Sequence, residues 1–232
     1  MSAPNLSIVL PVYNQEDHIR GVVEGYTTML DRLGGTYELM LVTNGCRDNS
    51  VAICQELTAD HEGVKTIDLG AQGGWGKAVR AGLREVTGET IGYTNTARTS
   101  PEILALCASY SRAFPNVVVK ANRKIRDNWR RRAGSLVYNL EVRALFDLPV
   151  WDINGTPKIF PRSFARLLDL EREDDLIDAE FNVICRREGY PIVEVPVLST
   201  QRHGGTSTTN YASGVRMYRG ALELRRRYGK MP

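Results

Sequence analysis

Short apolar runs alternate with helix-like stretches through the first half of the sequence, and no other feature constrains the fold as strongly. Apolar residues at helical spacing fill the gaps between the runs. One predicted helix is ended by Gly34 and another begins near Pro101. Strand–helix repeats with short connections form a mostly parallel sheet that carries helices on both faces. The predicted strands are residues 6–12, 37–42, 64–69, 90–93 and 117–120.

Neither an internal repeat nor a linker rich in proline, glycine or serine divides the chain, so we expect a single α/β domain over residues 1–232. Ligands bind such sheets beyond the carboxyl ends of the strands. The expected site is therefore formed by the loops after Val12, Val42, Leu69 and Tyr93. Further elements are expected in the second half: helices at 133–146 and 180–187, an edge strand at 190–197 and a basic C-terminal helix at 213–232.

The composition is that of an ordinary globular protein. Of 232 residues, 42% are hydrophobic and 25% are charged, with a net charge of +3. These values exclude a disordered or low-complexity chain. No run approaches the roughly 18 apolar residues that a membrane span needs. Four scattered cysteines indicate reduced thiols. We therefore expect a cytoplasmic protein, with peripheral membrane contact left open.

A dense basic run occupies residues 120–132, with seven basic residues and one acid. Such a run is often no more than a solvated face, and this interpretation stays open. Nucleic-acid binding is not expected, because the net charge is small and Trp129 is the one aromatic residue among these cations.

Six segments, taken in order, resemble family 2 glycosyltransferases with the Rossmann-like GT-A fold. Within that family, they look most similar to the dolichyl- or polyprenyl-phosphate sugar synthases. The resemblance covers roughly residues 6 to 210, and the order and spacing of the segments make it specific. The segments are LSIVLPVYNQEDHI at 6–19, YELMLVTNGCRDNS at 37–50, GGWGKAVRAG at 73–82, IGYTNTARTSPE at 91–102, WDINGTPKIFPR at 151–162 and EVPVLSTQRHGGTS at 194–207.

The resemblance implies a nucleotide-sugar donor and a set of donor-binding residues in these loops. Glu16 would accept a hydrogen bond from the nucleotide, although it also suits the start of a helix as a dipole-compensating acid. Asn44 stands where the family carries an acid and could pair with a base edge. Asp48 matches a family acid, but it also suits a helix N-cap. The implied donor-binding residues are Pro11, Tyr13, Asn14, Glu16, Asn44, Gly74, Lys77, Thr94, Asn95 and Thr96.

The main departure from the family lies at residues 94–97. The family places an Asp-x-Asp pair here, which binds a divalent ion. Counted back from Pro101, the pair falls on Thr94 and Thr96; counted forward from Tyr93, it falls on Asn95 and Ala97. Neither register contains a carboxylate, and Mg²⁺ and Mn²⁺ prefer anionic oxygen ligands. We therefore expect no metal cofactor here, and we expect acids introduced at Thr94 and Thr96 to create a metal site.

Fixed cations can replace a metal by stabilising the charge of a departing diphosphate. Arg131 and Arg202 in particular are expected to contact a phosphate of the donor or the acceptor. The residues implied for phosphate or acceptor binding are Arg123, Lys124, Arg126, Arg131, Ser135 and Arg202.

The acceptor implied by the resemblance is a lipid phosphate, which is already ionised and needs no general base. Arg202 and the two acids Asp152 and Glu180 are the candidate catalytic residues. Asp152 could orient an arginine or the acceptor, or only form a turn with Asn154. Glu180 could serve as a base for a hydroxyl acceptor, or only form an ion pair on a helix face.

Two alternatives to a metal-free enzyme follow from the missing acids. One is a descendant of the fold that binds a nucleotide or a sugar without transferring it. The other is a metal site built from relocated ligands, for which Asp48, Asp68 and Asp152 are candidates.

Overall fold

The computed structural model describes residues 3–71, 73–124, 129–198 and 211–229, with the side chains of 129–134 and 211–215 left out of the description. The strands are β1 (Leu6–Val12), β2 (Tyr37–Thr43), β3 (Val64–Asp68), β4 (Thr90–Tyr93), β5 (Val118–Arg123), β6 (Lys158–Pro161) and β7 (Ile192–Val197). The helices are α1 (Ile19–Leu33), α2 (Ser50–Asp60), α3 (Trp75–Glu85), α4 (Pro101–Ala113), α5 (Trp129–Phe146), the 3₁₀-helix η1 (Ala165–Leu167), α6 (Ile177–Glu188) and α7 (Tyr211–Tyr228).

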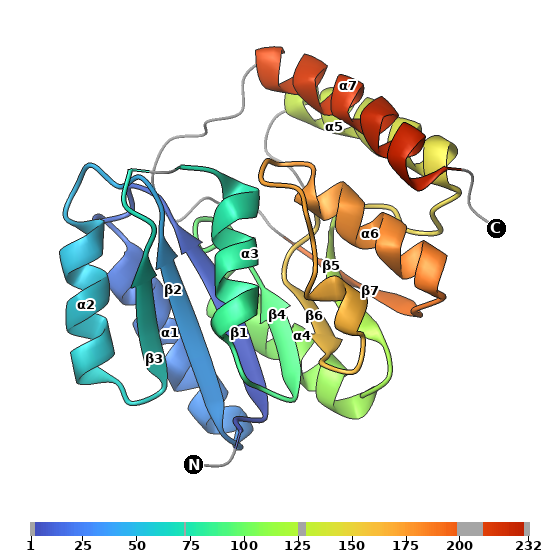
Figure 1. The fold of residues 1–232 in the computed structure, drawn as a ribbon. Coiled ribbons are helices and arrows are strands. Elements are labelled where there is room, and N and C mark those ends of the chain that lie inside the picture. The colour runs from blue at the N-terminus through green and yellow to red at the C-terminus, as the bar shows by residue number, and fades with distance from the viewer. Residues whose placement is uncertain (1–2, 72, 125–128, 199–210, 230–232) are drawn as a thin grey trace.

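The strands form one seven-stranded sheet in the order β3-β2-β1-β4-β6-β5-β7 (Figure 1). Among the described strands, only β6 runs antiparallel to its neighbours, β4 and β5. The other pairs, β1–β2, β1–β4, β2–β3 and β5–β7, are parallel. The predicted fold class, a mostly parallel sheet with helices on both faces, is confirmed, and β7 is the edge strand that the sequence predicted.

Alternation along β1 divides the core between the two faces of the sheet. Ile8 and Leu10 point to the face covered by α1, α2 and α4. Val9 points to the opposite face, where α3 and α6 pack. Because both faces are buried, the strands read as continuous apolar runs rather than as alternating ones.

The helix boundaries agree with the local chemistry of the sequence. Gly34 ends α1 with a φ of 69°, and Pro101 opens α4 behind Ser100, whose hydroxyl accepts a hydrogen bond from the Ile103 amide. Asp48 was a candidate N-cap for α2, but Asn49 occupies that position. Asp48 lies one residue earlier and accepts from the Ser50 amide at 3.1 Å, so it still satisfies a donor at the helix start.

Strand β6 was not predicted. It is four residues long, it begins at a lysine and it ends at a proline, so the sequence offers no apolar run to recognise. The strand is defined instead by its pairing, because β6 lies between β4 and β5 and pairs with both.

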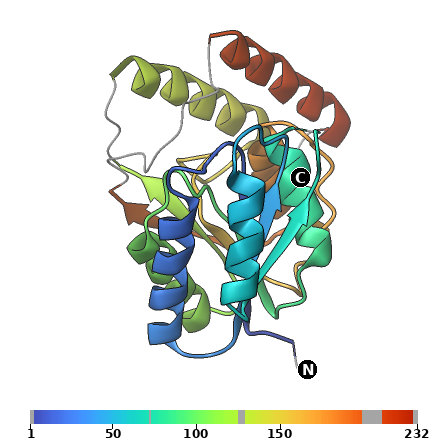
Figure 2. The ribbon, with the colours of Figure 1, turned by 90° about the vertical axis from the view of Figure 1, so that its left-hand side faces the viewer.

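Helices α5 and α7 pack on each other and form a layer over α6 (Figures 1 and 2). Their shared core contains Val142 and Phe146 of α5, Ala179 of α6, and Ala221 and Leu224 of α7. The basic C-terminal helix begins at Tyr211, two residues before the predicted start. No helix in the described ranges combines the length and the apolar character needed to cross a bilayer.

We predict that Gly82→Ala lowers the free energy of unfolding by about 1–3 kcal/mol, because α3 packs closely on the sheet at this glycine. An added Cβ would lie 2.3 Å from Cγ1 of Val9 and 3.1 Å from Cγ2 of Val42. Gly21→Ala is the matched control, since nothing lies within 4 Å of its added Cβ, and it should stabilise α1 by about 0.5–1 kcal/mol. Urea denaturation measures both, and equal effects would contradict the packing argument.

Candidate functional site

The loops that follow the parallel strands are joined at the carboxyl edge of the sheet, and Asn44 is their central link. Its side-chain amide donates to the Val12 carbonyl at 3.0 Å, and its Oδ1 accepts from the Gly74 amide at 3.1 Å. The side chain is 4% exposed. Asn44 therefore connects the ends of β1 and β2 to the start of α3, and both of its polar atoms are engaged within the protein.

The loop after β1 and the loop after β2 brace each other through reciprocal hydrogen bonds. The Glu16 amide donates to Asp48 at 3.1 Å, and the Asn49 amide donates to Glu16 at 2.9 Å. Asn14, whose φ is +49°, accepts from the Arg47 amide at 2.8 Å. The structure therefore brings Asn14, Glu16 and Asp48 together, as the sequence predicted for neighbouring strand ends.

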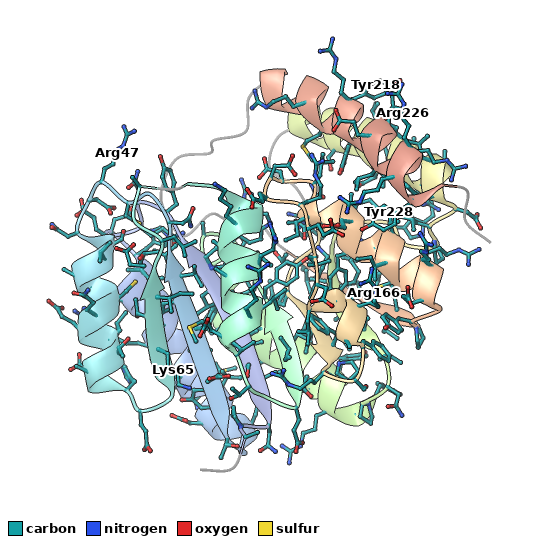
Figure 3. All side chains as sticks on the ribbon, in the orientation of Figure 1. Arg47, Lys65, Arg166, Tyr218, Arg226 and Tyr228 are labelled. Carbon is teal, nitrogen blue, oxygen red and sulfur yellow. The ribbon has the colours of Figure 1, made fainter. Side chains whose placement is uncertain are left out.

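The hydrogen bonds to Asp48 stabilise the charged form of its carboxylate. Burial alone would raise the pKa of Asp48, but hydrogen bonds from Ser50 and the Glu16 amide outweigh it and lower the pKa below its usual value. Tyr13 is 40% exposed beside this pair of loops, whereas Pro11 is buried. The Arg47 side chain points outward from the molecule (Figure 3).

Residues 94–97 are largely sealed into the protein. Thr94 and Thr96 are both fully buried. The Thr94 hydroxyl bonds the Thr99 hydroxyl at 2.7 Å, and the Thr96 hydroxyl donates to Gln15 at 2.6 Å. Asn95 is partly exposed, and its Oδ1 accepts from the Ala97 amide at 3.0 Å. Thr94 and Thr96 thus hold the loop against its neighbours, and neither presents an oxygen to a ligand.

The residues present at this loop do not fit a divalent ion. Thr94 and Thr96 supply neutral oxygens that are already hydrogen-bonded, and Asn95 alone reaches solvent. Within the described ranges, no group of three or more His, Cys, Asp or Glu residues is placed to hold a metal. Of the acids considered as relocated metal ligands, Asp152 uses its carboxylate to bind Arg123.

The start of α3 is held from the other half of the chain. The Lys77 amide donates to the Glu173 carbonyl at 3.1 Å, and the Lys77 ammonium lies 3.7 Å from the Glu173 carboxylate. Gly74 has a φ of 139°, and a Cβ there would approach the Glu173 carbonyl oxygen to 3.0 Å. Segment 172–174 therefore lies directly against the turn that the resemblance assigns to the donor.

Asp152 forms a two-pronged ion pair with Arg123 at the carboxyl end of β5. Nε and Nη2 of Arg123 donate to the two carboxylate oxygens at 2.7 and 2.8 Å, and the Arg123 amide adds a bond of 3.1 Å. Burial alone would lower the pKa of Arg123, but the hydrogen bonds and the charge of Asp152 outweigh it and raise the pKa. Asp152 thus orients an arginine, one of the two roles proposed for it.

This pair belongs to a largely buried ion cluster of three cations and three carboxylates: Lys120, Arg123, Lys158, Asp152, Asp178 and Glu194. Lys120 lies 3.2 Å from Glu194 and also donates to the Asp152 carbonyl. Lys158 pairs with Asp178, which accepts from the Tyr93 hydroxyl at 2.8 Å. Burial lowers the pKa of Lys120, and it lowers that of Lys158 to about 8. Sequence reasoning missed the two lysines because it expected charge on the surface.

Glu180, one of the predicted catalytic residues, is enclosed by hydrogen-bonding groups of the protein. It is fully buried. One carboxylate oxygen accepts from the Glu171 and Arg172 amides at 3.0 and 2.8 Å, and the other accepts from the Tyr228 hydroxyl at 2.8 Å. The carboxylate therefore ties α7 and residues 171–172 to α6. Neither a base that meets an acceptor nor an ion pair on a helix face describes this environment.

Asp175 is a candidate acid–base group that sequence reasoning passed over as part of an acidic stretch. It is open to solvent on one side and follows the segment that packs against the turn at Gly74. Crowding by the protein raises its pKa, and the neighbouring charges of Asp178 and Asp174 raise it further, against the opposing effect of Arg216. The raised pKa of this exposed carboxylate is a signal that only the structure could supply.

The predicted phosphate-handling set is described only in part. Lys124 is exposed and follows Arg123, and its amide extends the pairing with β7 by donating to the Val197 carbonyl at 3.0 Å. Ser135 is partly buried on α5. Arg126, Arg202 and the side chain of Arg131 lie outside the described residues, so their phosphate contacts stay predictions.

A mostly parallel sheet with polar loops gathered beyond β1, β2 and β4 defines a nucleotide-binding α/β protein of the GT-A class. The model of the family described as Glycosyl transferase family 2 matches residues 7–166, more than half of the chain. The chain belongs to glycosyl transferase family 2, the enzymes that transfer a sugar from a nucleotide-sugar donor. The family predicted from the sequence is confirmed, whereas the polyprenyl-phosphate subgroup stays a prediction.

Solved structures share the fold over nearly the whole chain. Glucosyl-3-phosphoglycerate synthase from Mycobacterium tuberculosis, in complex with Mn²⁺, UDP and phosphoglyceric acid, matches with a TM-score of 0.72 and 17% identity, over 98% of this chain and 79% of that chain. The same synthase with Mn²⁺, UDP-glucose and phosphoglyceric acid gives 0.69 and 17%, over 98% and 80%. A mycobacterial protein gives 0.71 and 20%, over 98% and 76%. At these identities, the likeness establishes the fold.

We predict that Thr94→Asp combined with Thr96→Asp destabilises the protein and creates no metal site, contrary to the expectation from sequence. Each change buries a carboxylate where a hydroxyl was satisfied, which should cost at least about 2 kcal/mol. Asn95→Asp is the control, because this side chain is partly exposed and keeps an acceptor for the Ala97 amide. Denaturation with and without Mn²⁺ measures both, and stabilisation of the double variant by Mn²⁺ would refute the prediction.

Proposed function

We propose that this glycosyltransferase moves its sugar to a phosphate-bearing acceptor, a polyprenyl phosphate, and that arginines take the place of a divalent ion. The observation that carries the proposal is the contrast between two loops. Residues 94–97 present no carboxylate, and Thr94 and Thr96 are sealed by hydrogen bonds. At the end of β5, a buried carboxylate holds Arg123 in a fixed orientation.

The reaction needs a positive charge beside the departing diphosphate. An acceptor oxygen attacks the anomeric carbon of the sugar, the bond from that carbon to the diphosphate oxygen breaks, and the electron pair leaves with the nucleoside diphosphate. Arg123 can stabilise that charge without reorganising, because Asp152 already fixes its guanidinium group. Lys124, the exposed next residue in the chain, is a second candidate cation.

A phosphate acceptor suits this site because it is ionised near neutral pH and needs no general base. Glu180, the base predicted for a hydroxyl acceptor, is enclosed and accepts three hydrogen bonds from the protein. The similar synthase has been crystallised with phosphoglyceric acid, so a molecule that carries a phosphate binds to a protein of this fold.

Titration calorimetry with a panel of nucleoside diphosphates and nucleotide-sugars, in EDTA and in Mg²⁺, tests the metal-free donor site. We predict equal affinity in the two buffers.

Arg123→Lys should weaken binding by about 1.5–3 kcal/mol, because a point charge cannot reproduce the planar fork held by Asp152. Arg131→Ala and Arg202→Ala should fall in the same range. Arg84→Lys, on the exposed last turn of α3, is the matched control. Binding that requires Mg²⁺ would overturn the metal-free site.

Turnover of the bound nucleotide-sugar is then measured with polyprenyl phosphate and, in parallel, with phosphoglyceric acid. Transfer to polyprenyl phosphate in EDTA supports the proposal. Transfer to phosphoglyceric acid alone would replace the lipid acceptor by a soluble one, and binding without transfer to either would contradict a phosphate acceptor.

A hydroxyl acceptor is the second candidate, because Asp175 is an exposed carboxylate two residues after Glu173, whose carbonyl oxygen lies against the turn at Gly74. A base must be deprotonated to act, and the pKa of Asp175 is raised, so the rate should increase with pH through a value above the ordinary range of aspartate. We predict that Asp175→Asn removes this limb of the pH profile and lowers kcat about 10²–10⁴-fold. Asp174→Asn, one residue away, is the control. A pH profile unchanged in Asp175→Asn would leave the phosphate acceptor as the better explanation.

A further inference from the structure

The positive charge of the chain is concentrated in the α5–α7 layer, defined as helices Trp129–Phe146 and Tyr211–Tyr228. The two helices contain nine arginines and two glutamates, a surplus of seven positive charges. The whole chain carries only +3, so the remainder carries a net −4. The molecule is therefore strongly polarised, which its modest net charge conceals.

The same layer exposes an unusual amount of apolar surface. Leu136, Val137 and Leu140 lie on the face of α5 opposite its buried residues Val142 and Phe146. On α7, Tyr218 and Leu222 follow each other at a spacing of four residues, so they share one face. These five side chains keep between 37% and 65% of their surface exposed. Exposed apolar side chains on two adjacent helices are typical of an interaction surface.

Exposed arginines border these apolar side chains. Arg219 and Arg226 of α7 are both exposed. Figure 3 shows Tyr218 and Arg226 on the outer side of α7, away from the body of the protein. A helix face that combines apolar residues with arginine matches the surface of an anionic bilayer, where the apolar side chains enter the lipid and the cations meet the headgroups.

The layer also lies on the side of the molecule where the site opens. The loops that follow β1 and β2 lie at the same end of the protein as α5 and α7 (Figures 1 and 2). Trp151, 58% exposed, carries the guanidinium group of Arg143 at 3.9 Å from its ring centre. Its neighbour in sequence is Asp152, which orients Arg123. Arg143 of α5 and the exposed Trp151 therefore connect the layer to the residue that precedes Asp152.

We propose that the α5–α7 layer docks the enzyme on the surface of an anionic membrane. A second copy of the chain fits this layer less well, because a two-fold contact would bring two surfaces with a large positive surplus together. A nucleic acid would leave the exposed leucines, valine and tyrosine without an apolar partner. Docking does not depend on the proposed acceptor, since the surface exists whatever molecule receives the sugar.

Sedimentation of the full chain with lipid vesicles, without donor or acceptor, tests the inference. We predict binding to phosphatidylcholine vesicles that contain phosphatidylglycerol, weak binding to phosphatidylcholine alone, and loss of binding as salt is raised. Arg219→Glu combined with Arg226→Glu should lower the partition coefficient roughly thirtyfold or more. Leu136→Glu combined with Leu140→Glu should lower it at least tenfold.

Matched controls carry the same substitutions elsewhere. Leu106→Glu changes a leucine of α4 that is 42% exposed, and Arg166→Glu changes an exposed arginine of η1, labelled in Figure 3. Both should bind vesicles like the unchanged protein, and circular dichroism checks that every variant is folded.

Equal loss of binding in the controls, or no binding of the unchanged protein to anionic vesicles, overturns the inference. So does a dimer, detected by light scattering, that the layer variants break. Vesicle binding with a soluble acceptor would leave the docking surface intact and refute only the lipid-phosphate proposal.

Discussion

The pairing of buried charges beside β6 is the constraint on which the second half of the structure depends. Lys120 and Lys158 are both fully buried, and a lysine in that position is tolerated only with a carboxylate against it. Asp178 on α6 and Glu194 on β7 supply the partners, so the ion cluster dictates where these two elements sit. Removing either carboxylate would leave an uncompensated charge in the core. The cluster therefore selects one arrangement of α6 and β7 on the sheet, whatever its net contribution to stability.

The same cluster explains how the chain supplies charge to its site without an acidic loop. In the first half of the chain, the carboxylates of Glu16 and Asp48 brace the loops after β1 and β2, and two buried threonines fasten residues 94–97. In the second half, the charges are paired in the core, and Arg123 of this cluster lies at the carboxyl end of β5, followed by the exposed Lys124.

The sequence predicted the elements well wherever a pattern was local. The apolar run of β1, the glycine that ends α1 and the proline that opens α4 each determine their element without help from distant residues. The sequence did not predict the burial of residues whose partners lie far along the chain. Lysine at the start of β6 gave no hint of burial, because its compensating carboxylate is on α6. Glu180 and Asp175 lie five residues apart, yet only the fold reveals that the first is enclosed and the second is open to solvent.

The hydrogen bond from Tyr228 to Glu180 links the end of the chain to the turn at the start of α3. Glu180 also holds residues 171–172, and the next residue, Glu173, holds the α3 turn through its carbonyl (Tyr228 is labelled in Figure 3). The last turn of α7 and the turn at the start of α3 are thus connected through the carboxylate of Glu180. Displacement of α7 would be transmitted to the donor turn through covalent chain and four hydrogen bonds. A change in the position of the C-terminal helix would therefore reach the turn at the start of α3, which the resemblance assigns to the donor.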